Sequence, residues 1–120
     1  MSDKQIKGLH ISEEEFQNRT IELAQRFGWR VAHFRAAKTE HGWRTPVSAD
    51  GSGFPDVVAV KGNKILFIEF KSNRGCHTES QKEWIARLGQ AARSEKCEVY
   101  VATWRPRDDD GIVKFLTADR

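Results

Sequence analysis

The chain has 120 residues, of which 38% are hydrophobic and 31% charged, and its formal net charge is +3. This length fits one compact domain, so we treat residues 1–120 as a single unit. No apolar run approaches the roughly 18–20 residues that span a bilayer, and the N-terminal residues lack an apolar signal region, so we expect a soluble protein of the cytoplasm.

The first predicted element is a helix that follows a polar, flexible leader of residues 1–11. Ser12 and Glu15 form a capping-box pattern at its start, and Gly28 ends it after Phe27. Spacings of three and four residues predict that one side of this helix faces the core. That predicted stripe consists of Phe16, Thr20, Leu23, Ala24 and Phe27.

A short strand over residues 29–34 is predicted next, followed by a long basic loop over residues 35–53. The loop carries Arg35, Lys38 and Arg44 together with an aromatic residue, Trp43. Loops of this length without structure of their own are usually functional or disordered. Two interpretations stay open for it, contact with a phosphate backbone and a plain mobile surface loop.

Two strands over residues 55–60 and 64–71 flank Gly62-Asn63, a two-residue signal for a hairpin. Both strands are apolar on both faces. We therefore expect the hairpin in the middle of a sheet that is covered on both sides.

Thr78 and Gln81 form a second capping box, which begins a helix that ends at about Arg93. Its predicted buried stripe is Trp84, Leu88 and either Ala91 or Ala92. A strand over 98–103 and a short final helix after Arg107 complete an α/β domain, a mixed central sheet flanked by helices in the order α-β-β-β-α-β-α.

The predicted hairpin places two acidic residues opposite each other. If Gly62 and Asn63 form the turn, Lys61 pairs with Lys64, so paired residue numbers sum to 125 and Asp56 pairs with Glu69. Directly opposed side chains lie roughly 4.5–5.5 Å apart at Cβ. Two carboxylates held this close repel each other, and a positive charge is needed between them.

Lys71 projects from the same face as Glu69, because side chains alternate along a strand. The rest of that face is apolar, and the polar trio therefore forms a pocket that suits a divalent cation with oxygen ligands. The alternative is a buried salt-bridge network without catalysis, although such networks stabilise folds poorly. Cys76, His77 and Cys97 lack zinc-site spacing, and we expect both cysteines to be free thiols.

These residues carry a resemblance to a known family. Gly53-Phe54-Pro55-Asp56, then Glu69-Phe70-Lys71, then Gln81 in the following helix, resembles the PD-(D/E)XK nuclease superfamily, with its restriction-endonuclease-like fold. The similarity is greatest to the VRR-NUC branch and its compact phage versions, and it extends from Ser12 to about Thr103.

The resemblance implies a set of site residues. Asp56 and Glu69 would bind Mg²⁺ or Mn²⁺ with the backbone carbonyl of Phe70, and Lys71 would assist the attack of water on a phosphodiester. The family also places an acidic residue of the first helix near the metal, and helical periodicity favours Glu13 over Glu14. Gln81 is expected to orient Lys71, water or substrate, although its capping role alone would explain it.

The resulting functional prediction is a Mg²⁺- or Mn²⁺-dependent DNA endonuclease. Arg35, Lys38, Arg44 and Arg74 are the predicted DNA contacts. By analogy, the enzyme would be a homodimer that resolves Holliday-type junctions, in the host cytoplasm if a phage encodes it. Two alternatives are a non-catalytic DNA-binding module and a nuclease subunit that works only with a partner such as a helicase or packaging protein.

Overall fold

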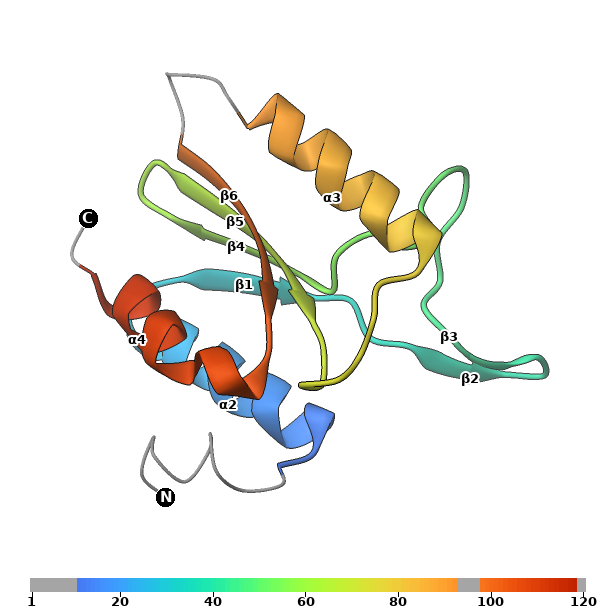
Figure 1. The fold of residues 1–120 in the computed structure, drawn as a ribbon, viewed down its shortest axis with the longest axis horizontal. Coiled ribbons are helices and arrows are strands. Elements are labelled where there is room, and N and C mark those ends of the chain that lie inside the picture. Colours follow the sequence, from blue (N-terminus) through green and yellow to red (C-terminus); the bar gives the residue numbers. More distant parts are fainter. Residues whose placement is uncertain (1–10, 93–97, 119–120) are drawn as a thin grey trace.

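A computed structural model describes residues 11–92 and 98–118, so the predicted leader, apart from Ile11, and Cys97 lie outside the described residues. Its centre is a four-stranded sheet in the order β1-β4-β5-β6 (Figure 1). The strands are β1 (Arg30–His33), β4 (Val57–Lys61), β5 (Lys64–Phe70) and β6 (Glu98–Trp104). Because β6 runs parallel to β5 and the other neighbours are antiparallel, the sheet is mixed, which confirms the predicted fold class.

Three α-helices accompany this sheet in the described part of the chain. They are α2 (Glu13–Arg26), α3 (Glu79–Ala91) and α4 (Asp109–Thr117), and a 3₁₀ turn over Pro106–Asp108 precedes α4. Both predicted capping boxes are present, with Ser12 and Glu15 at α2 and Thr78 and Gln81 at α3. None of these helices combines the length and apolar character needed to cross a membrane.

The β4–β5 hairpin has the predicted register. Lys61 pairs with Lys64 and Val57 pairs with Ile68, and Gly62 in the turn has a φ of 61°. The two strands occupy the centre of the sheet, as expected from their apolar sequences. The register therefore places Asp56, which directly precedes β4, beside Glu69 near the end of β5.

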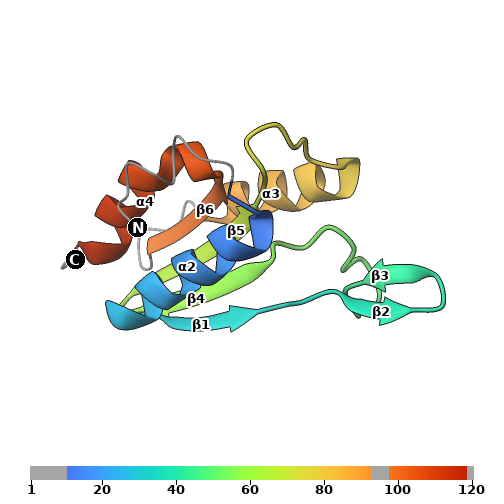
Figure 2. The same ribbon diagram turned by 90° about the horizontal axis from the view of Figure 1, so that it is seen from below.

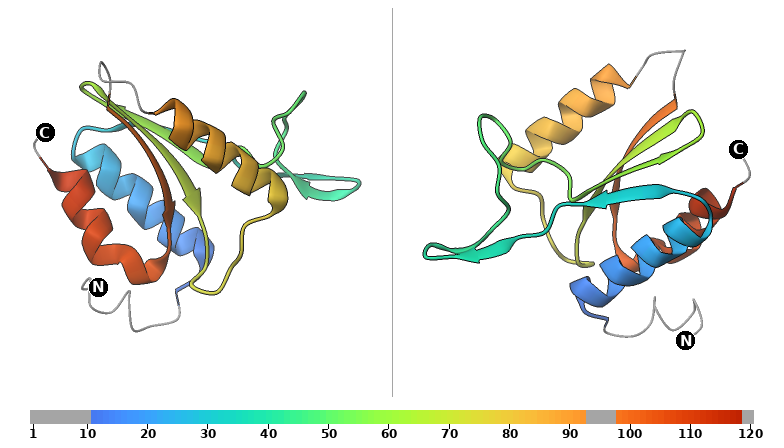
Figure 3. Two further views of the ribbon diagram at one scale, coloured as in Figure 1. Left: turned by 45° about the horizontal axis from the view of Figure 1, so that its top comes forward. Right: turned by 180° about the vertical axis from the view of Figure 1, so that it is seen from behind.

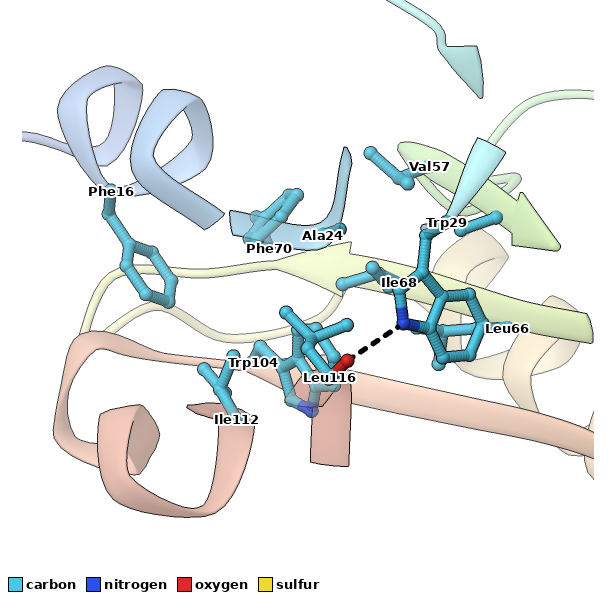
Figure 4. Packing of buried hydrophobic residues seen from close by; sticks show 11 residues of the cluster. Phe16, Ala24, Trp29, Val57, Leu66, Ile68, Phe70, Trp104, Ile112 and Leu116 are labelled. Atoms are coloured by element: carbon cyan, nitrogen blue, oxygen red, sulfur yellow. Dashed lines mark hydrogen bonds between the residues drawn. The ribbon is translucent and has the colours of Figure 1, made fainter. Parts of the chain in front are cut away.

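The hydrophobic core lies between the sheet and the layer formed by α2 and α4. Figures 2 and 3 show these two helices on the same face of the sheet. Phe16 of α2 meets Phe70 of β5 in an edge-to-face ring contact. The Trp29 Nε1–H donates to the Leu116 carbonyl over 3.1 Å, which ties the start of β1 to α4 (Figure 4). The helix prediction was wrong for Phe27, which is 40% exposed because the chain turns away at Gly28.

The opposite face of the sheet is only partly covered. No residue of α3 is fully buried, so the prediction of a buried stripe on this helix was wrong. Trp84 and Leu88 are half-buried, and Val60 on the sheet beneath is 43% exposed. A single helix does not shield this face fully, which also corrects the expectation of a sheet covered on both sides.

The basic loop of residues 35–53 contains regular structure that the sequence interpretation did not include. β2 (Ala37–Thr39) and β3 (Gly42–Arg44) form a separate antiparallel hairpin, with Lys38 opposite Trp43. This hairpin extends away from the main sheet beyond the end of β1 (Figure 2). The short strands escape prediction because three residues carry too little periodicity.

Candidate active site

Asp56 and Glu69 meet at the end of the β4–β5 hairpin. The Phe70 N–H donates to Asp56 Oδ2 over 3.0 Å, so the backbone of β5 fixes the position of this carboxyl group. Glu69 is only 3% exposed. The predicted opposition of the two acidic residues is thus present.

The pKa values of both carboxyl groups are raised. For Asp56 the main cause is burial, opposed by the Phe70 N–H and the nearby His33 and Lys71. For Glu69, burial and then the Asp56 charge raise the pKa to about 8, and Lys71 opposes this. A hydrogen bond between the two carboxyl groups raises the pKa of Glu69 further and opposes the rise at Asp56.

Lys71 and Gln81 both approach Glu69. The Lys71 Nζ lies 3.8 Å from Glu69 Oε2, and Gln81 Nε2 donates to the same oxygen over 2.9 Å. Gln81 Oε1 also accepts from the Thr78 N–H over 2.8 Å. The two explanations for Gln81 are therefore compatible, because one end of its amide caps α3 while the other holds the Glu69 carboxyl.

The loop after Lys71 is held by Arg105, which the sequence interpretation overlooked. Its Nη1 donates to the carbonyls of Ser72 and Gly75, each over 2.7 Å. His77 is half-buried, and its Nε2 lies 2.9 Å from the Thr103 hydroxyl. Burial and the Lys71 charge lower the pKa of His77. No local pattern signals these roles, since their partners are distant in sequence.

Gly53 brings the loop before Asp56 against the start of α3. It has a φ of 84°, and a Cβ at this position would lie 2.5 Å from the Ser80 carbonyl carbon. The Trp84 Nε1–H also donates to the Asp50 carbonyl, which fixes the same loop to α3. Only glycine allows this close approach, which places Pro55 and Asp56 next to Gln81.

We expect Gly53→Ala to lower the free energy of unfolding by about 2–4 kcal/mol, through backbone strain and the clash with Ser80. Urea unfolding measures the effect. Gly62→Ala is the matched control, because its φ of 61° is also positive but no atom lies within 4 Å of the added Cβ. It should cost only about 1 kcal/mol. Equal losses in the two variants would contradict the role of close packing at Gly53.

Two surface grooves meet at Asp56. The loop groove, of about 640 Å³, is lined by Phe34, Trp43–Val47, Gly51–Asp56 and Gln81. The helix groove, of about 490 Å³, is lined by Glu13, Glu14, Gln17, His33–Ala36, Trp43, Thr45 and Asp56. Asp56 is therefore accessible from two sides.

Glu13 is exposed, not turned into the core as its periodicity suggested. Its charge nevertheless contributes to the raised pKa of Glu69, so it acts on the carboxyl pair from the end of α2. Glu14 lines the same groove. His33 was also overlooked; burial and Arg35 lower its pKa, and Asp56 opposes this.

Two of the four predicted DNA contacts line the grooves that meet at Asp56. Arg35 lines the helix groove and donates to Asn18 Oδ1 over 3.4 Å, whereas Arg44 lines the loop groove. Lys38 is exposed on the β2–β3 hairpin, and Arg74 is exposed in the loop held by Arg105. Cys76, in the same loop, is an exposed free thiol.

Comparisons with known proteins identify the family. A comparison with curated proteins finds no match to this chain. The structure is similar to that of Archaeoglobus fulgidus Hjc, a Holliday junction resolvase from an archaeal hyperthermophile, with 24% sequence identity and a TM-score of 0.40. The match covers 76% of this chain and 65% of that one. A family model described as archaeal Holliday junction resolvase (Hjc) matches residues 35–120. Because this match spans more than half of the chain, the protein belongs to the archaeal Holliday junction resolvase family.

Proposed function

We propose that this protein is a divalent-metal-dependent endonuclease that hydrolyses phosphodiester bonds in branched DNA such as Holliday junctions. The observation that carries the proposal is the contact between two carboxyl groups, Asp56 at the meeting point of two open grooves and the buried Glu69 behind it. Membership of the resolvase family supports the choice of substrate. A buried salt-bridge network without catalysis explains neither the repulsion between the carboxyl groups nor the position of Asp56 at two open grooves.

The donor set fits a hard divalent cation. In the part of the chain that the structure describes, no three acidic, histidine or cysteine side chains are preassembled around a metal position. Two carboxyl groups with raised pKa values instead form a pair that a cation would relieve of its repulsion. Asp56, Glu69 and the Phe70 carbonyl would hold Mg²⁺ or Mn²⁺, with Glu13 acting from the end of α2.

When bound, such a cation supplies Lewis-acid polarisation and neutralises phosphate charge. The protein's own groups then position the reactants. Gln81 holds one oxygen of Glu69 by its amide N–H, which leaves the orientation of this carboxyl group fixed. Lys71, beside the same oxygen, donates a hydrogen bond to the attacking water and stabilises the negative charge that develops on the phosphate.

Several finer features belong to the same proposal. Two copies would act together, because a chain of 120 residues offers little surface with which to hold a four-way junction. A helicase or packaging protein is a candidate partner. Assignment to the VRR-NUC branch and a phage source stay predictions that rest on the motif resemblance alone.

The direct test is cleavage by the purified protein. Mg²⁺ and Mn²⁺ are titrated separately against linear, nicked and four-way-junction DNA, with EDTA as the metal-free control. We expect metal-dependent cleavage that favours the junction. Binding without cleavage at every metal concentration would support the non-catalytic alternative, and cleavage that appears only with a partner protein would support the subunit alternative.

We expect DNA affinity to fall as salt rises, because Arg35, Lys38 and Arg44 are proposed to contact phosphates. Replacing any one of them by alanine should reduce the slope of log affinity against log salt by about 1. Fluorescence anisotropy at several salt concentrations measures the slope. Arg26→Ala, at the far end of α2, is the matched control and should leave it unchanged. If the slope is unchanged in all variants, residues 35–53 do not contact phosphates and form a plain surface loop.

Glu13→Ala should reduce metal-supported cleavage at least about tenfold, the scale of a residue that supports metal ligands. Glu13 acts on Glu69 electrostatically, whereas the Glu15 side chain is engaged in the capping box of α2. Cleavage rates at several Mn²⁺ concentrations measure the effect. Glu14→Ala and Glu15→Ala are the matched variants and should leave the chemistry largely intact. The reverse ranking would transfer the role to Glu14.

A further inference from the structure

An aromatic and apolar surface lies beside the carboxyl pair, and the proposed chemistry does not use it. The large hydrophobic side chains that are exposed in the described part of the chain include Phe34 at 45%, Trp43 at 70% and Val47 at 53%. All three line the loop groove that ends at Asp56. Single exposed apolar residues are ordinary, but three that share one groove indicate a binding surface.

Phe34 and Trp43 occupy the junction of the two grooves. Together with Thr45 and Asp56, they line both the loop groove and the helix groove. Phe34 is held from behind by an edge-to-face contact with Phe54, whose ring also contacts Trp84 of α3. Trp43 has no such ring contact within the described residues, and its indole is free to bind a flat ligand.

Cationic side chains lie beside Trp43 on the side of the loop groove, whereas Glu13 and Glu14 line the helix groove. The loop-groove side is therefore the one that suits an anionic ligand. Lys38 lies directly opposite Trp43 in the β2–β3 hairpin, so the two side chains project from the same face of that hairpin. Arg44 lines the loop groove, where the carboxyl group of Asp56 is the only acidic side chain in the lining. An exposed indole with cations beside it is the arrangement by which proteins bind single-stranded nucleic acid, with a base on the ring and phosphates on the cations.

We infer that Trp43, supported by Phe34, binds an unpaired nucleobase of the DNA strand next to the bond that is cut. This inference rests on the proposed function and deepens it by naming the substrate class. In an uninterrupted duplex both faces of each base are occupied by its neighbours, so a base reaches Trp43 only where stacking is already broken. Branch points and bulges meet this condition, and preference for branched DNA then originates at the β2–β3 hairpin.

Binding in EDTA tests the inference without cleavage. The probes are an uninterrupted 24-base-pair duplex and the same duplex with two unpaired thymidines at its centre. We expect the wild-type protein to prefer the bulged duplex, and its tryptophan emission to be quenched on binding. Trp43→Ala should weaken binding to the bulged duplex at least about tenfold and to the uninterrupted duplex less than about twofold, because stacking on the ring is lost.

Two further variants make the result specific. Trp43→Phe keeps an aromatic ring and should retain most of the preference for the bulged duplex. Phe27→Ala is the control, because Phe27 is 40% exposed but lines neither groove. It should leave the affinity for both duplexes unchanged. Equal weakening on both probes, no weakening, or no preference in the wild-type protein would each overturn the inference. If the surface instead binds a protein partner, Trp43→Ala should weaken binding to neither duplex.

Cleavage of the same duplexes in Mn²⁺ separates the two proposals. A wild-type protein that cuts neither duplex nor a four-way junction contradicts the proposed function, while its preference for the bulged probe in EDTA still supports base binding. If the wild-type protein cuts and the Trp43→Ala variant still prefers the bulged duplex as strongly as the wild type does, the result supports the nuclease and overturns the role of Trp43.

Discussion

Glu69→Gln and Lys71→Ala should each reduce metal-dependent cleavage by at least about a hundredfold, the scale of a lost acid–base or charge-stabilising group. Glutamine removes a proposed cation ligand but keeps the shape of the side chain, and its amide oxygen can still accept from Gln81 Nε2. Alanine at position 71 removes the cation 3.8 Å from Glu69 Oε2. Initial rates on a four-way junction in saturating Mn²⁺ measure both effects.

Control variants exclude general loss of structure or charge. Glu98→Gln changes an exposed carboxyl group on β6 that accepts from the Tyr100 hydroxyl, and Lys114→Ala removes an exposed cation on α4. Both should cleave at the wild-type rate. Circular dichroism should show an unchanged fold for all four variants. Wild-type cleavage by Glu69→Gln or by Lys71→Ala would remove the proposed mechanism.

The metal-free protein should become less stable as pH rises from 6.5 to 8. The folded state raises the pKa of Glu69 from 4.5 to about 8. Between pH 4.5 and pH 8, folding therefore takes up a proton at Glu69. The stabilising contribution of this protonated group is complete below pH 4.5 and is lost as the pH rises through 8. One pKa unit corresponds to about 1.4 kcal/mol, so the free energy of unfolding should fall by about 2 kcal/mol over this interval.

Urea unfolding in EDTA at pH 6.5, 7.5 and 8.5 measures this dependence. The interval begins at 6.5 because the lowered pKa values of His33 and His77 act in the opposite direction, since their stabilising contribution is lost as pH falls below that value. Glu69→Gln cannot titrate and should give a flatter profile, with higher stability than the wild type at pH 8.5. A wild-type profile as flat as that of the variant would contradict the buried, repulsive carboxyl pair.

The two predictions address different properties of one side chain. Cleavage reports what Glu69 does with a cation bound, and metal-free stability reports the repulsion that a cation would relieve. A variant that is inactive yet more stable at high pH is the combination expected of a site shaped for binding and not for stability.

Sequence alone determined the elements whose causes are local. The capping boxes at Ser12 and Thr78 fixed the starts of α2 and α3. The two-residue turn at Gly62-Asn63 fixed the register of β4 with β5, and this register alone opposes Asp56 to Glu69. Strand alternation then assigned Lys71 to the same face. Each of these results depends on residues a few positions apart or on arithmetic within one hairpin.

Only the tertiary structure decided the features that depend on distant contacts. Helical periodicity predicted that Glu13 and Phe27 face the core, but both are exposed. Glu13 is the first residue of α2 and Phe27 is its C-cap, so neither lies in the middle of the helix, where the phase of the helix decides burial. The dual contacts of Gln81 require the docking of α3 beside β5, which Gly53 permits by its close approach to Ser80. The junction of the two grooves at Trp43 requires a hairpin of three-residue strands, too short for a periodic signal, to be placed at the end of β1.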